Sequence, residues 1–497
     1  MTFRGSESRQ RRDWEQAVSN AVRGDHWKQT GRLVLSLAAY QRAITKWPAF
    51  PEAFNNLGTV LMSLGRMEEA VRCLRQALHI RPDLLPARCN LLLALLHSPA
   101  RSPEAAAEAH RQWGRQFPAP PPAADGPAPA GRIRLGYVSA NFLINPEGFV
   151  IQPLLRHHDR SRFEIFCYSN ALRCDEWTRR YQRLAEHWRD ISHKSDEQAA
   201  RLIRRDGIQI LVDCSGHWNH GRLSLFSLKP APIQVSLPTY PATTGLAAVD
   251  YRITDRQADP RGLTEHLHTE KLIRLLRVCI TYQPPSEAPD VNHLPALENG
   301  HVTYGCFNRR QKITDEMLRL WATILKRVPG SRLLFHHTFG GRKTVVREIT
   351  NPILSRFAGL GVDPARIRFL GRLPLAEHLR VFHQVDLCLD TFPYHGMTMT
   401  CESLWMGVPV ITLAGRSHVS RIGVSLLTVT GLEDFIAHSR PEYIRIAIDT
   451  ANDLERLARL RTTLRERMRR SSLTHADHYA RALERAYLRM LAGTPNN

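Results

Sequence analysis

The sequence predicts an all-α repeat segment followed by an α/β region of two doubly wound lobes. A repeated pattern of small and apolar residues occupies the first quarter, and a proline- and alanine-rich stretch follows it. Beyond that stretch, short β-rich runs alternate with amphipathic helical patterns, which is typical of doubly wound α/β domains. With 497 residues the chain is too long for a single core. We therefore expect repeats over 12–117, a linker over 118–130, and lobes over 131–300 and 301–492.

The repeat is clearest over 51–82, PEAFNNLGTVLMSLGRMEEAVRCLRQALHIRP. Its small and apolar residues have the spacing of a tetratricopeptide unit, and similar residues recur one period of about 34 residues earlier. Gly58 and Ala70 let the two helices of a unit approach closely, Leu57 and Leu74 fill the space between them, and prolines end the second helices. A third, degraded unit is expected over 87–117. So short an array should lean on the next domain.

The first lobe is expected to contain five strands, and the second lobe another five. In the first lobe these are 133–140, 163–170, 208–216, 233–237 and 250–255. In the second they are 302–308, 331–337, 366–371, 386–392 and 409–415. Helices are expected over 314–330 and 472–493, and the latter could pack across both lobes. Two Rossmann-like lobes facing a cleft are therefore predicted.

The formal net charge of +21 would by itself suggest a nucleic-acid or anionic membrane partner. The arginines responsible are scattered along the chain, however, and no recognition motif accompanies them, so solvated helix faces and a basic cleft are the preferred interpretation. We expect no specific nucleic-acid partner.

Nine cysteines occur without a CxxC pair or a zinc-type spacing, and Cys167, Cys214 and Cys388 lie in apolar runs. Buried reduced thiols are expected, which favours a reducing compartment. No run approaches the ~20 apolar residues needed to span a bilayer, and the N-terminus has no apolar leader segment. We expect a cytoplasmic protein with no membrane partner.

The strongest local motif is LCLDTFPYHGMTMTCESLWMGVPVITLAG, over 387–415. A buried strand ends at Asp390, a helix begins near Thr398, and a second strand follows. Ligands bind at the carboxyl ends of such strands, where helix N-termini present free N–H groups to phosphate. Thr398 and Thr400 could add hydroxyl donors, although threonine at such a position is more often a helix cap.

This stretch resembles the catalytic lobe of the O-GlcNAc transferases, glycosyltransferase family 41. The resemblance extends over roughly 131–490, through IRLGYVSANF, DGIQILVDCSGH, KPAPIQVSLPTYPATTGLAAVDYRITD and CFNRRQKIT. It implies a two-lobed GT-B fold and inverting, metal-independent transfer of a sugar from a UDP donor, UDP-GlcNAc, to Ser or Thr hydroxyls of proteins selected by the repeats. No cofactor is implied, and the sequence contains no DxD motif of the metal-binding type.

The resemblance also implies site residues. Lys312 aligns with the family's essential lysine, and a cation there would stabilise the leaving diphosphate. Asp206 is the other catalytic candidate, near the acceptor or sugar. The UDP-sugar site would comprise Lys312, His378, Met397, Thr398, Met399 and Glu402, and the acceptor and sugar side would comprise Asn145, Tyr240, Thr243 and Thr244. We expect no metal ligand among them.

Three departures from the family pattern leave alternatives open. Asn145 stands where the family has a histidine, and an amide cannot act as a general base. Met397 and Met399 replace members of a His-Thr-Thr sequence, and Pro238 and Ala242 replace other family residues in the PTYPATTG loop. The alternatives are another donor or acceptor, such as glucose to Asn or a GDP-fucose donor, or a repeat-bearing adaptor whose lobes have lost activity.

Overall fold

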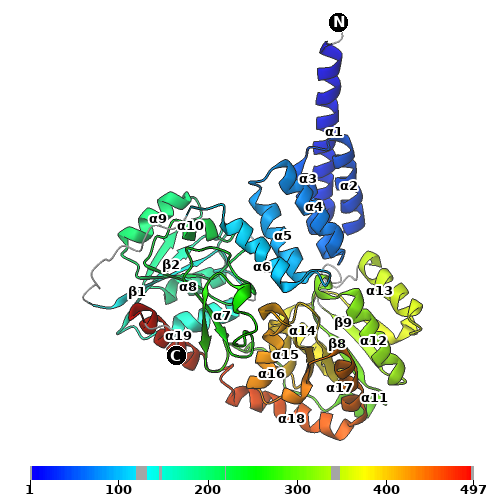
Figure 1. The fold of residues 1–497 in the computed structure, drawn as a ribbon. Coiled ribbons are helices and arrows are strands. Elements are labelled where there is room, and N and C mark those ends of the chain that lie inside the picture. Colours follow the sequence, from blue (N-terminus) through cyan, green and yellow to red (C-terminus); the bar gives the residue numbers. More distant parts are fainter. Residues whose placement is uncertain (1–2, 119–130, 145–147, 219, 337–346, 494–497) are drawn as a thin grey trace.

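The computed structural model describes residues 3–118, 131–144, 148–218, 220–336 and 347–493. Six helices form an N-terminal arm, and two parallel sheets form the lobes below it (Figure 1). This arrangement confirms the predicted fold class. The linker over 119–130 and Asn145 lie outside the described residues.

The arm is made of antiparallel helices, as the repeats predict. Gly58 allows the close packing, because a Cβ there would lie 2.7 Å from Leu74 Cγ. The helices before Pro48 and Pro82 end at Lys46 and Ile80. The degraded third unit is also a helix pair. The six helices are α1 (Phe3–Gln29), α2 (Leu33–Lys46), α3 (Pro51–Ser63), α4 (Met67–Ile80), α5 (Leu85–His97) and α6 (Pro103–Gly114).

The first lobe is a seven-stranded parallel sheet in the order β3-β2-β1-β4-β5-β6-β7. All five predicted strands are present, while β3 and β7, at the two edges, are additional. The strands are β1 (Ile133–Ser139), β2 (Phe163–Ser169), β3 (His187–Asp190), β4 (Ile210–Asp213), β5 (Ile233–Ser236), β6 (Tyr251–Asp255) and β7 (Lys271–Leu275). The intervening helices are α7 (Gly148–His157), α8 (Glu176–Leu184), α9 (Asp196–Arg205) and α10 (Leu223–Ser227).

The second lobe is a six-stranded parallel sheet in the order β10-β9-β8-β11-β12-β13. Its five predicted strands are present and the two-residue β13 is additional. The strands are β8 (Thr303–Cys306), β9 (Arg332–His336), β10 (Ile367–Leu370), β11 (Leu387–Leu389), β12 (Val410–Leu413) and β13 (Ile436–Ala437). The helices are α11 (Pro295–Asn299), α12 (Asp315–Arg327), α13 (Arg347–Gly359), α14 (Leu375–Val381), α15 (Thr398–Trp405), α16 (Ile422–Val429), α17 (Arg440–Asn452) and α18 (Leu454–Arg470).

The C-terminal helix α19 (Ala476–Leu491) packs on the first lobe, beside α7 (Figure 1). Tyr479, Leu483 and Tyr487 are buried in one core cluster with the strands of that lobe. Two expectations are corrected by this packing. The helix does not bridge both lobes. It also completes the first lobe, although the predicted boundaries place it in the second lobe, over 301–492.

The repeat arm leans on the lobes, as a short array should. Its core and that of the second lobe form one continuous cluster, from Tyr40 and Leu57 to Tyr304 and Trp321. On the first-lobe side, His110 Nε2 lies 2.8 Å from the Tyr240 hydroxyl.

Helix α6 meets the first lobe through two glycines whose backbones touch. A Cβ on Gly114 would lie 1.8 Å from the carbonyl oxygen of Gly245, and one on Gly245 would lie 2.1 Å from that of His110. Since backbone atoms cannot move aside as a flexible side chain can, this contact requires the absence of a side chain at both positions.

The cysteines are as expected: all nine are free, and Cys167, Cys214 and Cys388 are buried. None of the helices in the described part of the chain is both long and apolar enough to cross a bilayer.

We predict that Gly114→Ala destabilises the docked arm, because the added methyl overlaps the Gly245 carbonyl. The expected loss is about 1–3 kcal/mol, as for other overpacked sites, visible as a lower apparent Tm in thermal unfolding. Gly359→Ala is the matched control, since nothing lies within 4 Å of a Cβ at that position. Equal Tm values for the two variants would contradict the prediction.

Candidate active site

A cavity of about 380 Å³ opens between the two lobes and the end of α5. Apart from His97 of α5, its walls come from the loops and helix N-termini that follow the carboxyl ends of strands, where ligands bind in doubly wound sheets. From the first lobe these are Asn141, Trp218, Pro238, Thr239 and Pro241. From the second they are Phe307, Asn308, Arg309, Gln311, Lys312, Tyr394, His395, Met397, Thr398, Met399, His418, Val419 and Ile422. We refer to this cavity as the cleft.

Lys312 presents the ammonium group that the sequence predicts. It follows β8 in a short 3-10 turn, its Nζ donates to the His395 carbonyl at 2.7 Å, and it lies 4.2 Å from the centre of the Tyr394 ring. Burial lowers the pKa of Lys312 to about 7, although Asp390 opposes this by favouring the charged form. An anion entering the cleft would hold the proton on this group.

The loop after β11 is organised by one buried carboxylate. Asp390 Oδ1 accepts hydrogen bonds from the Asn308 amide and from the backbone N–H groups of Thr391 and Gly396, at 2.8 to 3.0 Å. These bonds fix the entry to α15, whose N-terminus opens into the cleft at Thr398. Free N–H groups and a lysine ammonium on one cavity wall form an anion site.

The flanking residues of this loop divide into two groups. Met397, Thr398 and Met399 line the cleft as expected. Thr400 is buried, does not line the cleft, and its hydroxyl donates to the Gly396 carbonyl at 3.0 Å, so it is bonded to its own loop.

His378 and Glu402 lie behind the cleft wall. His378 Nε2 is 2.9 Å from Glu402 Oε2, and both side chains are buried. The cleft-lining Phe307 packs edge-on against His378 at 5.9 Å between ring centres. The two residues expected in the UDP-sugar site are thus brought together, but they support the wall and do not line it.

The acceptor-side prediction needs correction for Tyr240 and Thr244, while Thr243 lines a cavity beside the cleft but not the cleft itself. The buried Tyr240 hydroxyl bonds His110 of α6, while Thr243 and Thr244 both donate to the buried carboxylate of Glu270. These side chains tie the loop to the repeat arm and to β7. The residues of this loop that line the cleft are instead Pro238, Thr239 and Pro241.

The prediction of a catalytic Asp206 is wrong. This residue caps the C-terminus of α9, ahead of the first residue of β4, and its carboxylate accepts hydrogen bonds from Tyr168 and Arg189. The cleft lies at the opposite, carboxyl ends of the strands. An Asp-Gly pair before a strand is here an ordinary turn.

Several cleft residues were not predicted. Trp218 follows β4 and Asn308 follows β8, so their position after buried strands could have indicated that they line the cleft. Tyr394 lies inside the strongest motif, and His97 stacks on its ring at 4.2 Å. No local sequence feature identifies His97 as a cleft residue, because its position in the cleft depends on how the repeat arm packs against the lobes.

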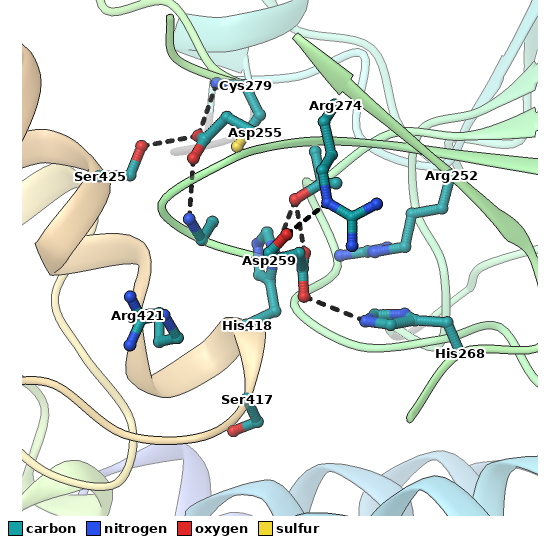
Figure 2. Close-up of polar contacts among 12 residues, drawn as sticks. Arg252, Asp255, Asp259, His268, Arg274, Cys279, Ser417, His418, Arg421 and Ser425 are labelled. Atoms are coloured by element: carbon teal, nitrogen blue, oxygen red, sulfur yellow. Dashed lines mark hydrogen bonds and ion pairs between the residues drawn. The ribbon is translucent and has the colours of Figure 1, made fainter. Parts of the chain in front are cut away.

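A cluster of buried polar groups joins the lobes beside the cleft (Figure 2). Asp255, at the end of β6, accepts from the Ser425 hydroxyl at 2.6 Å, and Arg421 donates to the Gln257 carbonyl at 2.8 Å. Asp259 lies 2.7 Å from His418 Nδ1. Each of these contacts links the first lobe to the segment after β12.

The described residues include one group of three possible metal-binding side chains, His475, Asp477 and His478, at the start of α19. None of them lines the cleft. Two cationic side chains, Lys312 and Arg309, are among the described residues that line the cleft, and the N-terminus of α15 opens beside them.

Comparison with known proteins gives matches over most of the chain. Residues 122–280 and 292–483 match the sequence profile of Glycosyl transferase family 41, and residues 51–84 match that of the tetratricopeptide repeat. The chain is 34% identical to a solved mutant of the Thermobaculum terrenum O-GlcNAc transferase, with a TM-score of 0.89 over 98% of this chain and 94% of that one.

Two curated plant relatives illustrate the sequence matches. A protein of Oryza sativa subsp. japonica, named "Probable UDP-N-acetylglucosamine--peptide N-acetylglucosaminyltransferase SPINDLY", is 39% identical over 84% of this chain and 46% of its own length. The similarly named SEC protein of Arabidopsis thaliana is 33% identical over 72% of this chain and 37% of its own. The chain thus spans less than half the length of these relatives.

We predict that UDP binding weakens as pH rises above 7, because the bound diphosphate favours the charged form of Lys312, whose pKa in the empty cleft is about 7. The loss should approach tenfold per pH unit until the pKa of the bound state is reached. Titration calorimetry between pH 7 and 9, above the second phosphate pKa of about 6, measures it.

Lys312→Met should bind UDP more weakly and without this pH dependence. Lys326→Met, an exposed lysine on α12, is the control and should behave like the unaltered protein. Persistence of the pH dependence in Lys312→Met would assign it to another group.

Proposed function

Because this chain belongs to Glycosyl transferase family 41, we propose that it transfers N-acetylglucosamine from UDP-GlcNAc to Ser or Thr hydroxyls of proteins, with inversion. The observation that carries the proposal is the cleft itself. Lys312 and the N-terminus of α15 face one cavity between two Rossmann-like lobes. The names of the plant relatives and of the bacterial neighbour support the same chemistry.

The part of Lys312 in this reaction is electrostatic. As the bond between the sugar and the diphosphate breaks, negative charge develops on the leaving phosphate oxygen. An ammonium held beside it by the His395 carbonyl and the Tyr394 ring stabilises that charge without prior reorganisation. The proposed reaction is therefore metal-independent and needs no cofactor.

The repeat arm is proposed to select the protein acceptors. Its last helix pair reaches the cleft, since His97 at the end of α5 lines it. A polypeptide lying along the arm would thus be guided to the donor. Repeat arrays commonly bind partners along such extended surfaces.

A second candidate keeps the reaction and changes the donor or acceptor, with glucose to Asn and a GDP-fucose donor as examples. The observation that favours it is the apolar character of Met397 and Met399, which line the cleft where the resemblance places polar side chains. A 6-deoxy sugar such as fucose, which carries a methyl group in place of one hydroxyl, would fit such a wall more readily.

We predict that a mixture of this protein, UDP-GlcNAc and a Ser-containing acceptor protein yields an acceptor heavier by one N-acetylhexosamine, as measured by intact-mass spectrometry. Lys312→Met should reduce the rate at least a hundredfold, the usual effect of losing a transition-state donor. The Lys326→Met control should retain the rate. If no nucleotide sugar gives a mass increase although UDP still binds, the adaptor alternative is correct.

We also predict that UDP-GlcNAc stabilises the protein more than UDP-glucose or GDP-fucose does in thermal-shift measurements. A ligand at 100 times its Kd contributes about 2.7 kcal/mol. A larger shift with another nucleotide sugar would identify that sugar as the donor.

A further inference from the structure

The proposed reaction requires a group that removes the proton of the acceptor hydroxyl, and Asn145 cannot do so. None of the described residues that line the cleft carries a carboxylate, and three are histidines: His97, His395 and His418. Among the described residues that line the cleft, these three rings are the candidates for a histidine base.

Two of the rings are unsuitable. The Nδ1 of His97 is bound to the Leu93 carbonyl, and its Nε2 is fully buried without a partner, so an acceptor cannot reach it. His395 uses both nitrogens within the protein. Its Nε2 lies 2.9 Å from the Leu413 carbonyl, and its Nδ1 accepts from the Gly423 N–H at 3.2 Å.

His418 has one nitrogen engaged and the other available. Its Nδ1 lies 2.7 Å from Asp259 Oδ2 (Figure 2). An ionised carboxylate only accepts hydrogen bonds, so Nδ1 donates, and the neutral ring carries its lone pair on Nε2. Nε2 has no hydrogen-bond partner among the described residues and is not among the fully buried atoms. It therefore faces the space that His418 lines.

Asp259 is held as a carboxylate by the groups around it. The residue is fully buried, the Thr254 hydroxyl donates to Oδ2, and His268 Nε2 lies 3.2 Å from Oδ1. Burial alone would raise its pKa, but His418 and His268 together hold the pKa well below its ordinary value. A fixed negative charge behind Nδ1 orients the ring and stabilises the imidazolium that forms when Nε2 takes a proton.

The position of His418 also suits an acceptor. It lines both the cleft and an adjoining cavity of about 300 Å³ between the repeat arm and the two lobes. The carbonyl of its neighbour Val419 accepts from the N–H of His395, the residue whose own carbonyl holds Lys312. An acceptor entering from the arm would pass His418 before it meets a donor bound beside Lys312.

We propose that His418, oriented by Asp259, is the general base that activates the acceptor hydroxyl, an inference that rests on the proposed function. Nε2 takes the hydroxyl proton as the oxygen uses its electron pair to bond the sugar's anomeric carbon. The bond from that carbon to the diphosphate oxygen breaks, and its electrons leave with UDP beside Lys312. The imidazolium then releases its proton to water. Asp259 is a positioning residue.

The decisive variant is His418→Asn, whose side-chain amide can still donate to Asp259 but has no Nε2. With a Ser acceptor the transfer rate should fall about 10²- to 10⁴-fold, the usual contribution of a general base. The thermal shift caused by UDP should be unchanged. Ser425→Ala is the matched control, since it removes the neighbouring interlobe hydrogen bond to Asp255 and should leave the rate near that of the unaltered protein.

A comparison of Cys and Ser acceptors shows whether His418 acts as a base or only supports the structure of the site. A thiol with a pKa of about 8.5 is largely ionised at pH 9 and needs little help in losing its proton. The loss in His418→Asn should then be much smaller for Cys than for Ser at pH 9. An equal loss for both acceptors, or no loss for Ser, overturns the proposal.

The pH profile gives a second readout. With saturating donor and a Ser acceptor, a general base makes the rate rise with pH, and this rising limb should be absent in His418→Asn. Asp259→Asn should lower the rate at least tenfold, because the ring loses its fixed orientation. The charged and titratable groups around His418 are Asp255, Asp259, His268, Arg252, Arg416, Arg421, His395, Arg101 and Glu104. If the rate of His418→Asn still rises with pH, one of these other groups is responsible, and the assignment of His418 as the base is wrong.

Failure of the proposed function is distinguishable from failure of this inference. If the unaltered protein transfers no sugar, the proposed function fails and the inference fails with it. If it transfers sugar to Ser and His418→Asn does so equally well, the inference alone fails.

Discussion

The seating of the last repeat between the lobes is the constraint on which the site depends. Helix α5 places His97 flat on the Tyr394 ring, and Tyr394 is also the ring over which the Lys312 ammonium lies. Helix α6 is fixed by the Gly114–Gly245 contact and by the bond from His110 to Tyr240. The repeat arm and the second lobe, which supplies most of the cleft, therefore share one packed core.

Two buried carboxylates of the first lobe set the relation between the lobes. Asp255 and Asp259 follow β6 and take their partners, Ser425 and His418, from the second lobe. Burial of a carboxylate is unfavourable unless it is bonded, and separating the lobes would remove one partner from each of the two. The Asp259 contact also orients His418 toward the cleft, so the orientation of that ring depends on a residue of the other lobe.

The sequence predicts elements with strong local signals and misses those defined by distant partners. The central strands are apolar runs and were found, whereas the edge strand β3, His187–Asp190, has four polar or half-exposed residues and gives no such signal. Lys312 and Thr398 were found through a motif. Asp206, Tyr240 and Thr244 were assigned from neighbouring motif residues, although their side chains point into other networks. His418 lies 159 residues from Asp259, so no local pattern could pair them.

The return of α19 to the first lobe has a consequence for how the protein is made. Tyr479, Leu483 and Tyr487 are buried in the core of the first lobe, yet they follow the whole second lobe in the chain. During synthesis the second lobe can therefore fold while the first lobe still lacks helix α19. The core of the first lobe is therefore complete only after α19 has been made, and a deletion of this helix would damage the first lobe although the second lobe directly precedes it in the chain.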